Sequence, residues 1–155
     1  MSAAALLDLY RRAGLRIVTA ESCTGGLLAA RLTDVPGSSD VLEWGFVTYS
    51  NASKSELLGV PTALIAKHGA VSAQVARAMA EGALAHGPAE VAIAVTGIAG
   101  PGGATPGKAV GHVYIALARR GRDTAVERHQ FGGDRAAVRE ATVESAFELL
   151  GAALA

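Results

Sequence analysis

The sequence predicts an α/β fold, a three-layer α/β/α sandwich on a mixed sheet of about five strands, in a single domain over residues 1–155. Three observations lead to this fold. The chain is long enough for one hydrophobic core but too short for two ordinary ones. Apolar, partly β-branched runs alternate with segments of helical periodicity. The last two strand-like runs flank the turn "GRD", which is typical of an antiparallel hairpin.

Each expected element has a local reason. The N-terminal segment is amphipathic, with Leu6, Leu9 and Tyr10 directed inward and Gly14 as its stop. The run "AEVAIAVTG" does not alternate between apolar and polar residues, which predicts a strand that is buried on both faces. In chain order, the expected elements are the N-terminal helix, a strand over 15–21, a helix over 23–32, a strand over 43–50, short helices over 53–59 and 62–67, a helix over 71–87, strands over 89–97, 111–120 and 124–131, and a helix over 134–154.

Capping residues mark several helix ends. Ser53 followed by Glu56 matches a capping box, which would make Lys54 the first residue of its helix. Ser72 and Asp134 are expected to cap the two long helices that follow them. The last helix carries an apolar stripe formed by Ala136, Val143, Ala146, Phe147 and Leu150.

The composition argues against several classes of function. Lys and Arg number 14 and Asp and Glu also number 14, so the chain lacks the basic excess of a general nucleic-acid binder. No membrane partner or signal peptide is expected, because no apolar run has the length of a membrane span and no basic region precedes the N-terminal apolar residues. The single cysteine, Cys23, fits a reducing, cytoplasmic location. No metal is expected, because no His, Cys and acid cluster has ligand spacing.

The stretch "TAESCTGGLLAARL" gathers polar side chains and two glycines at one point. Ser22 follows the strand 15–21 directly, which places its hydroxyl at the carboxyl edge of the sheet, where open α/β sheets bind ligands. The amides of Cys23, Thr24 and Gly25 are expected to begin the next helix and to hold a phosphate or an oxyanion. Two alternatives stay open here: Ser22 or Thr24 as a simple helix cap, and Cys23 as the nucleophile.

A serine nucleophile needs a base. Lys54 is the candidate, because a position in the first turn of a helix and burial both disfavour the charged amine and lower its pKa. Tyr49, five residues earlier, can hydrogen-bond within the same site. The alternative is an ordinary solvated lysine. Four histidines are also present, and none has an acid arranged as in a catalytic triad: His68, His86, His112 and His129.

A glycine-rich segment, "GIAGPGGATPGK", follows the strand 89–97 at the same expected edge as Ser22. Its length is unusual for a connection without a role, which favours a pocket wall over a flexible link. Part of it, "GGATPGKA", matches the first seven positions of a Walker A loop. Ala109 stands where that loop needs Ser or Thr, and a strand rather than a helix follows, so a phosphate-transfer function is disfavoured.

The block "FGGDRAAVRE" begins the last helix. Arg139 lies four residues before Val143, on the apolar stripe near the helix start. An arginine at such a position either extends its guanidinium to solvent or directs it at an anion, and the residue types do not decide between the two.

Five ordered blocks together resemble the CinA C-terminal domain family, the nicotinamide-nucleotide amidases. They are "TAESCTGGLLAARLTDVPGSS", "GFVTYSNASKSELLGV", "GAVS", "AVTGIAGPGG" with "GKAVGHVYIA", and "FGGDRAAVRE", and they cover nearly the whole chain. The resemblance implies hydrolysis of nicotinamide mononucleotide to nicotinic acid mononucleotide and ammonia, in pyridine-nucleotide salvage. It also implies a Ser–Lys amidase without metal or cofactor. The family also occurs fused behind a larger N-terminal domain, so the stand-alone form is expected here.

Carried over by position, the resemblance implies Ser22 as the nucleophile, Lys54 as the base and Tyr49 as a third catalytic residue. The implied partner is a small-molecule nucleotide, and a homo-oligomer such as a dimer is expected. An arginine of the last block is expected to hold the phosphate. The substrate-binding residues expected from the blocks and the glycine-rich segment are Glu21, Cys23, Thr24, Gly25, Thr96, Gly97, Gly100, Gly102, Arg135 and Arg139.

A rival hypothesis keeps the pocket but omits catalysis, leaving a nucleotide-sensing or protein-interaction module. The joint presence of Ser22 and Lys54 is the feature that favours the enzyme, since a module of this kind would need neither.

Overall fold

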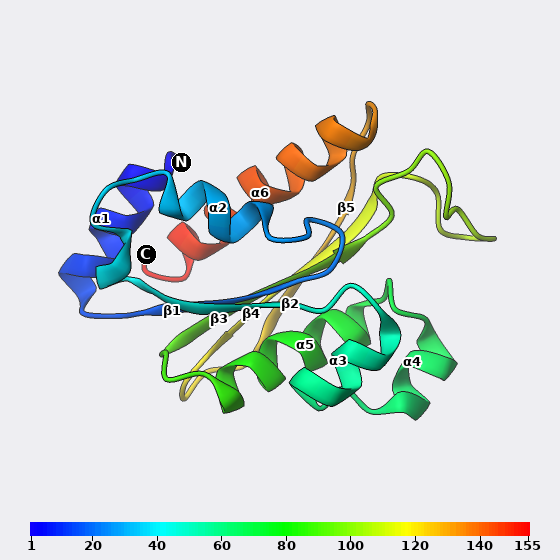
Figure 1. Ribbon diagram of the computed structural model, residues 1–155, viewed down its shortest axis with the longest axis horizontal. Helices are drawn as coiled ribbons and strands as arrows, with labels where there is room; N and C mark the ends of the chain where they lie inside the picture. The colour runs from blue at the N-terminus through cyan, green and yellow to red at the C-terminus, as the bar shows by residue number, and fades with distance from the viewer.

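Five strands form one mixed sheet in the computed structural model, which describes all residues from 1 to 155 (Figure 1). The strand order is β2-β1-β3-β4-β5. β1 pairs in parallel with both β2 and β3, whereas β4 pairs antiparallel with both β3 and β5. The strands are β1 (Ile17–Glu21), β2 (Leu42–Val47), β3 (Val91–Gly97), β4 (His112–Arg119) and β5 (Ala125–Gln130).

Helices cover both faces of this sheet, which confirms the three-layer α/β/α sandwich (Figure 1). One face packs against α1 (Ala3–Ala13), α2 (Leu27–Thr33) and α6 (Arg135–Ala152). The other packs against α3 (Asn51–Leu58), α4 (Thr62–His68) and α5 (Ala73–His86). A short 3₁₀ helix, η1 (Ser38–Asp40), precedes β2.

The central strand β3 divides its side chains by size between the two faces. Val91, Ile93 and Val95 belong to the core with α1, α2 and α6, and the alanines between them face α5. Since successive residues of a strand point to opposite faces, this run is apolar throughout yet serves two cores. Small side chains on the second face let α5 approach the sheet closely.

Helix α2 begins four residues later than the sequence predicts. Gly25 and Gly26 have φ angles of 57° and 106°, in the left-handed region, which a right-handed helix does not use. Residues 22–26 therefore form a turn, and the helix starts at Leu27. The predicted roles of Ser22 or Thr24 as the helix cap are wrong, because the N-cap position is occupied by Gly26.

Helix α3 begins earlier than predicted. Its N-cap is Ser50, whose Oγ accepts a hydrogen bond from the Ser53 amide, and Ser53 in turn donates its hydroxyl to the Ser50 carbonyl. The predicted capping box of Ser53 and Glu56 is therefore wrong. Lys54 is the fourth residue of the helix rather than the first, so the helix dipole acts on its amine less directly than expected.

The predicted helix ends are confirmed for three helices, whereas the predicted buried faces of α1 and α6 are partly wrong. Ser72 and Asp134 cap α5 and α6, and Gly14 ends α1 with φ of 68°. The buried face of α1 uses Leu7 in place of Leu9, and Ala136 is exposed rather than part of the α6 stripe. The remaining stripe residues of α6 are buried, as predicted: Val143, Ala146, Phe147 and Leu150.

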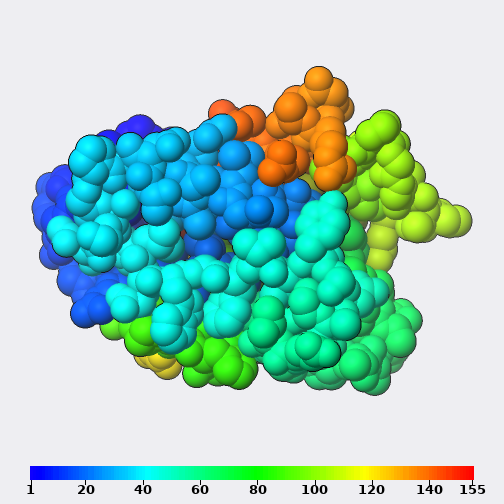
Figure 2. Space-filling model, viewed as in Figure 1, coloured from blue at the N-terminus to red at the C-terminus, as the bar shows by residue number.

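The carboxyl ends of the three parallel strands meet at one edge of the sheet, as parallel pairing requires. There the Ser22 amide donates to the Val95 carbonyl and the Thr48 amide donates to the Glu21 carbonyl, so the ends are held in register. The glycine-rich segment leaves the same edge after β3, and its exposed part, residues 101–107, projects from the body of the molecule (Figures 1 and 2). No helix has both the length and the apolar character needed to cross a membrane.

Candidate active site

Ser22 and Lys54 meet at the carboxyl edge of the sheet. The two residues are 32 positions apart in sequence, and the Lys54 Nζ lies 3.0 Å from the Ser22 Oγ. Parallel pairing of β1 and β2 brings them together, because Ser22 follows β1 directly and Lys54 lies in the helix that follows β2. The serine and lysine expected from the sequence are thus in hydrogen-bond contact.

The Lys54 amine is almost fully enclosed. The residue is 1% exposed, and its Nζ also lies 2.8 Å from the Thr48 carbonyl oxygen and 3.2 Å from that of Tyr49. No carboxylate forms an ion pair with it. Burial without a counter-charge lowers the pKa of Lys54 from its ordinary value, because desolvation penalises the charged amine.

The Lys54 Nζ donates to the Ser22 Oγ and to the two carbonyl oxygens. When the amine is neutral it keeps two N–H groups and one lone pair. Carbonyl oxygens cannot donate, so only the Ser22 hydroxyl can then give a proton to that lone pair. The arrangement is that of a base placed against a nucleophile.

The turn after Ser22 offers free backbone donors. The amides of Cys23 and Thr24 donate to no backbone oxygen, whereas the Gly25 amide is bonded to the Ser22 carbonyl. Thr24 is fully buried and only Cys23 lines the cavity, so the Cys23 amide is the donor that an oxyanion there can use. Both amides belong to a turn and not, as predicted, to the first turn of a helix.

Glu21 stabilises the turn formed by residues 22–26 and does not line the cavity at Ser22. Its buried carboxylate accepts hydrogen bonds from the Thr24 hydroxyl at 2.6 Å, the Leu28 amide at 2.8 Å and the Ala29 amide at 3.1 Å. It therefore satisfies the first amides of α2, which Gly26 cannot cap because glycine has no side chain. Its position favours a structural role over contact with a ligand.

Arg139 also stabilises this turn, through a hydrogen bond from α6. Its guanidinium donates to the Thr24 carbonyl at 2.8 Å and lies beside Gly25. The position of Arg139 on the buried side of α6 is thus explained by a contact with the turn. Arg139, Thr24 and Gly25 are not among the residues that line the cavity at Ser22.

A cavity of about 210 Å³ opens onto the Ser22–Lys54 pair. Arg135 lines it, and its guanidinium donates to the Gly100 carbonyl at 2.8 Å and to the Tyr49 hydroxyl at 3.2 Å. Tyr49 is 61% exposed at the rim, so its carbonyl faces Lys54 while its hydroxyl is held by Arg135. The cavity is lined by Ser22, Cys23, Tyr49, Asn51, Lys54, Ala70, Val71, Thr96, Gly97, Ala99 and Arg135.

The glycine-rich segment contributes less to this cavity than predicted. Thr96 and Gly97 line it, but Gly100 and Gly102 do not. The Gly100 carbonyl instead accepts from Arg135, and a Cβ on Gly102 would meet nothing within 4 Å. The reason is that the chain turns outward after Ala99, so only the first residues of the segment face Ser22.

Four lining residues were missed by the sequence reasoning. Asn51 begins α3 within the block "YSNASK", Ala70 and Val71 belong to the block "GAVS", and Ala99 lies in "GIAGP". Their blocks were identified, but apolar and small residues carry no chemical signal of their own. The amide of Asn51 does, and its place between Ser50 and Lys54 could have indicated it.

Cys23 is a poorer nucleophile than its neighbour. The residue is 6% exposed, and burial raises the pKa of Cys23 to about 11, which keeps its thiol protonated near neutral pH. The lysine amine contacts Ser22 and not the cysteine sulfur. The local geometry thus favours Ser22.

Other potential catalytic groups lie away from the cavity. None of the four histidines lines it, and no three His, Cys, Asp or Glu side chains converge in a way that could hold a metal ion. The Walker-like segment forms a narrow turn in which Thr105 and Lys108 exchange backbone hydrogen bonds of 2.9 Å, and β4 follows it. It lacks the helix of a P-loop.

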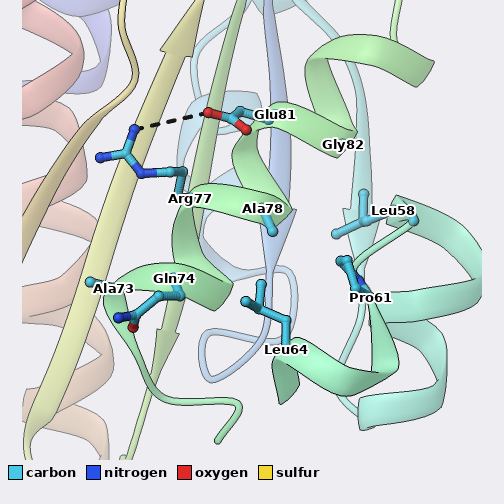
Figure 3. Close-up of a pocket in the computed structure, with 10 residues that line it drawn as sticks. Leu58, Pro61, Leu64, Ala73, Gln74, Arg77, Ala78, Glu81 and Gly82 are labelled. Atoms are coloured by element: carbon cyan, nitrogen blue, oxygen red, sulfur yellow. Dashed lines mark ion pairs between the residues drawn. The ribbon is translucent and has the colours of Figure 1, made fainter. Parts of the chain in front are cut away.

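The largest cavity of the molecule is a different one. It measures about 670 Å³ and lies between α5 and the α3–α4 pair (Figure 3). Arg77 and Glu81, its only charged lining residues, form an ion pair with each other and both bond to Thr124. Its two charges are paired with each other and no serine, cysteine or lysine lines it, so size alone does not identify the active site.

The comparisons with known proteins agree with the fold. The family model described as CinA C-terminal domain matches residues 1–154. A CinA-like protein of Geobacter sulfurreducens is 53% identical over 146 residues, which are 94% of this chain and 35% of that protein. A putative competence-damage inducible protein of Symbiobacterium thermophilum is 56% identical over 140 residues, 85% of this chain and 33% of that protein. The chain thus spans about a third of the length of these curated relatives.

Solved structures are similar along their whole length. The competence/damage inducible protein CihA from Agrobacterium tumefaciens superposes with a TM-score of 0.95 at 46% identity, covering 97% of this chain and 92% of that one. A CinA superfamily protein from Klebsiella pneumoniae gives a TM-score of 0.93 at 35% identity, covering 99% and 98%. Sequence blocks, fold and family model therefore agree, and the chain belongs to the CinA C-terminal domain family.

Proposed function

We propose that this chain is a nicotinamide-nucleotide amidase that hydrolyses nicotinamide mononucleotide to nicotinic acid mononucleotide and ammonia. The observation that carries the proposal is the contact of 3.0 Å between the buried Lys54 amine and the Ser22 hydroxyl. An unpaired buried lysine is costly to a fold. Here the buried lysine contacts a serine at the wall of a cavity, and an amine in that position can act as a catalytic base.

The acylation step follows from the contacts. The Ser22 oxygen attacks the carboxamide carbon, and its proton passes to the Lys54 nitrogen. The negative charge that develops on the carboxamide oxygen is held by the amide of Cys23, which lines the cavity and donates to no backbone oxygen. The C–N bond then breaks as Lys54 returns the proton to the departing nitrogen, which leaves as ammonia and leaves an ester on Ser22.

Deacylation repeats the sequence with water. Lys54, neutral again, accepts a proton from a water molecule as its oxygen attacks the ester carbon. The second tetrahedral species uses the same Cys23 amide. Lys54 then returns the proton to the Ser22 oxygen, which frees the product as its carboxylic acid and restores the starting state. The acid gives its remaining proton to solvent. Lys54 carries the proton in both half-reactions, and no step needs a cofactor.

The size and lining of the cavity fit the reacting end of the substrate. A volume of about 210 Å³ is at the small end for a ligand pocket, so it suits the nicotinamide ring better than the whole nucleotide. Thr96 and Asn51 line it and offer polar atoms to a carboxamide, and Ala70 and Val71 offer apolar surface to the ring. The ribose and phosphate would extend past the rim.

The test is product analysis with the purified protein. Incubation with nicotinamide mononucleotide should release ammonia and nicotinic acid mononucleotide in equal amounts, and the rate should be the same with and without a chelator. A chelator-sensitive rate would argue for a metal-dependent mechanism. If the nucleotide binds but no ammonia appears, the chain is instead the non-catalytic nucleotide-sensing module.

A further inference from the structure

Lys108 is a cation without a counter-charge beside the active site. It is the only charged residue in the segment that joins β3 to β4. Its ammonium donates to the His68 carbonyl at 2.7 Å, at the end of α4, and forms no ion pair with any carboxylate. An ammonium has three donors, so two remain available.

A second cavity, of about 170 Å³, lies against this ammonium. Lys108 and Thr105 supply its polar side chains, and no acidic residue lines it. Ala70 and Val71 line both this cavity and the one at Ser22, so the two share a wall. A hydrogen bond of 2.9 Å from the Thr96 hydroxyl to the Ala70 carbonyl fixes that wall to the end of β3.

The backbone around Lys108 is shaped to keep its amine in place. A Cβ on Gly69, whose φ is 80°, would lie 3.0 Å from the Lys108 Nζ, so a side chain there would displace the ammonium. The mutual backbone bonds of Thr105 and Lys108 fix the turn from which the lysine extends. A glycine-rich loop thus presents one cation to a small space, although it is not a P-loop.

The position of this space matches what a nucleotide substrate needs. If the ring and carboxamide of the substrate occupy the cavity at Ser22, the anion at the far end of the substrate has to bind outside that cavity. Arg135 lines the cavity at Ser22 itself, which places it near the ring, whereas Lys108 lies across the wall. A phosphate monoester can accept hydrogen bonds from the free donors of this ammonium.

We infer that Lys108 and the second cavity form a subsite for the phosphate monoester of the substrate, while the carboxamide lies at Ser22. The inference rests on the proposed function for the identity of the other end of the ligand. It differs from the expectation that an arginine of α6 holds the phosphate.

Steady-state kinetics on two substrates test this subsite. The phosphate-bearing substrate is nicotinamide mononucleotide, and the phosphate-free one is nicotinamide riboside. Lys108→Met should raise KM for the nucleotide about tenfold or more, as expected for the loss of one charge-assisted hydrogen bond, and leave KM for the riboside unchanged. Lys108→Arg should restore part of the affinity. Lys67→Met removes an equally positive, exposed side chain from α4 and should change neither value.

Direct binding separates this inference from the proposed function. Titration of ribose 5-phosphate into the wild type, Lys67→Met and Lys108→Met requires no turnover. Loss of binding in Lys108→Met alone supports the subsite even if no amide is hydrolysed. If the nucleotide is hydrolysed and Lys108→Met behaves like Lys67→Met in both assays, the subsite is wrong and the proposed function still holds.

Discussion

The Lys54 amine and the Ser22 hydroxyl are 3.0 Å apart, and the other two neighbours of that amine are backbone carbonyl oxygens. This combination determines how the amine titrates. No acid is present to hold a proton on it, and burial opposes the charge, so the pKa of Lys54 is lowered. The predictions below follow from a neutral lysine that faces a serine.

The rate should depend on pH through this amine. Activity requires neutral Lys54, so kcat/KM should rise with pH to a plateau. The apparent pKa of that rise should lie below the ordinary lysine value of about 10.4. Lys54→Arg should be nearly inactive, because a guanidinium keeps its proton. The measurement is a pH profile of ammonia release. Wild-type turnover by Lys54→Arg would show that Lys54 supplies only charge.

The same burial should appear in the pH dependence of stability. Because the pKa of Lys54 is lower in the folded state, the unfolded state binds more protons between the two pKa values. The stability of the wild type relative to Lys54→Met should therefore increase as the pH rises from neutral toward 10. Thermal unfolding of both proteins across this range measures it. A constant difference in Tm would mean that the pKa of Lys54 is not lowered on folding.

Cys23 should be dispensable for the chemistry. Its thiol is buried and protonated near neutral pH, and the base contacts its neighbour instead. Cys23→Ala should keep most of the activity, apart from a modest loss from the cavity that a smaller side chain leaves. Assays of ammonia release and thermal unfolding of the variant check this. A loss of activity as large as that of Ser22→Ala, with the fold intact, would identify the sulfur as the nucleophile.

The two arginines of α6 should separate into different roles. Arg139 supports the turn through the Thr24 carbonyl, so Arg139→Met should lower stability by about 1–3 kcal/mol and reduce kcat. Arg135 lines the cavity, so Arg135→Met should raise KM for both nicotinamide mononucleotide and its riboside and leave Tm nearly unchanged. Kinetics and thermal unfolding distinguish them. If Arg135→Met affects only the nucleotide, the phosphate binds at Arg135.

Much of the fold could be predicted from the sequence because its signals are local. The apolar run of β3 indicated a doubly buried strand, the turn between β4 and β5 indicated a hairpin, and Ser72 and Asp134 indicated helix starts. The start of α2 could not be predicted as well, since the left-handed conformations of Gly25 and Gly26 depend on support from Glu21 and Arg139. Arg139 is 115 positions from Thr24 in sequence, so its contact with the turn arises only in the folded chain.

In the candidate active site, too, some features follow from local sequence and others depend on tertiary contacts. The contact between Ser22 and Lys54 could be anticipated, because both residues follow parallel strands. Of the two causes predicted for a lowered pKa of Lys54, burial is confirmed and the position at the helix start is wrong. The capping box placed it at a helix start, whereas enclosure by the Thr48 and Tyr49 carbonyls is a tertiary effect. The homo-oligomer stays a prediction, which sedimentation of the purified protein would check.

The rate of ammonia release from nicotinamide mononucleotide by Ser22→Ala, compared with the wild type, tests the central claim most directly. The substitution removes one oxygen atom from a residue that is 8% exposed, and the turn keeps its bonds to Glu21 and Arg139, so the fold should be unchanged. We predict a loss of at least about 10³-fold in kcat, as for the removal of a covalent nucleophile. If the wild type is active and Ser22→Ala releases ammonia at the same rate, Ser22 is not the nucleophile and the account is contradicted.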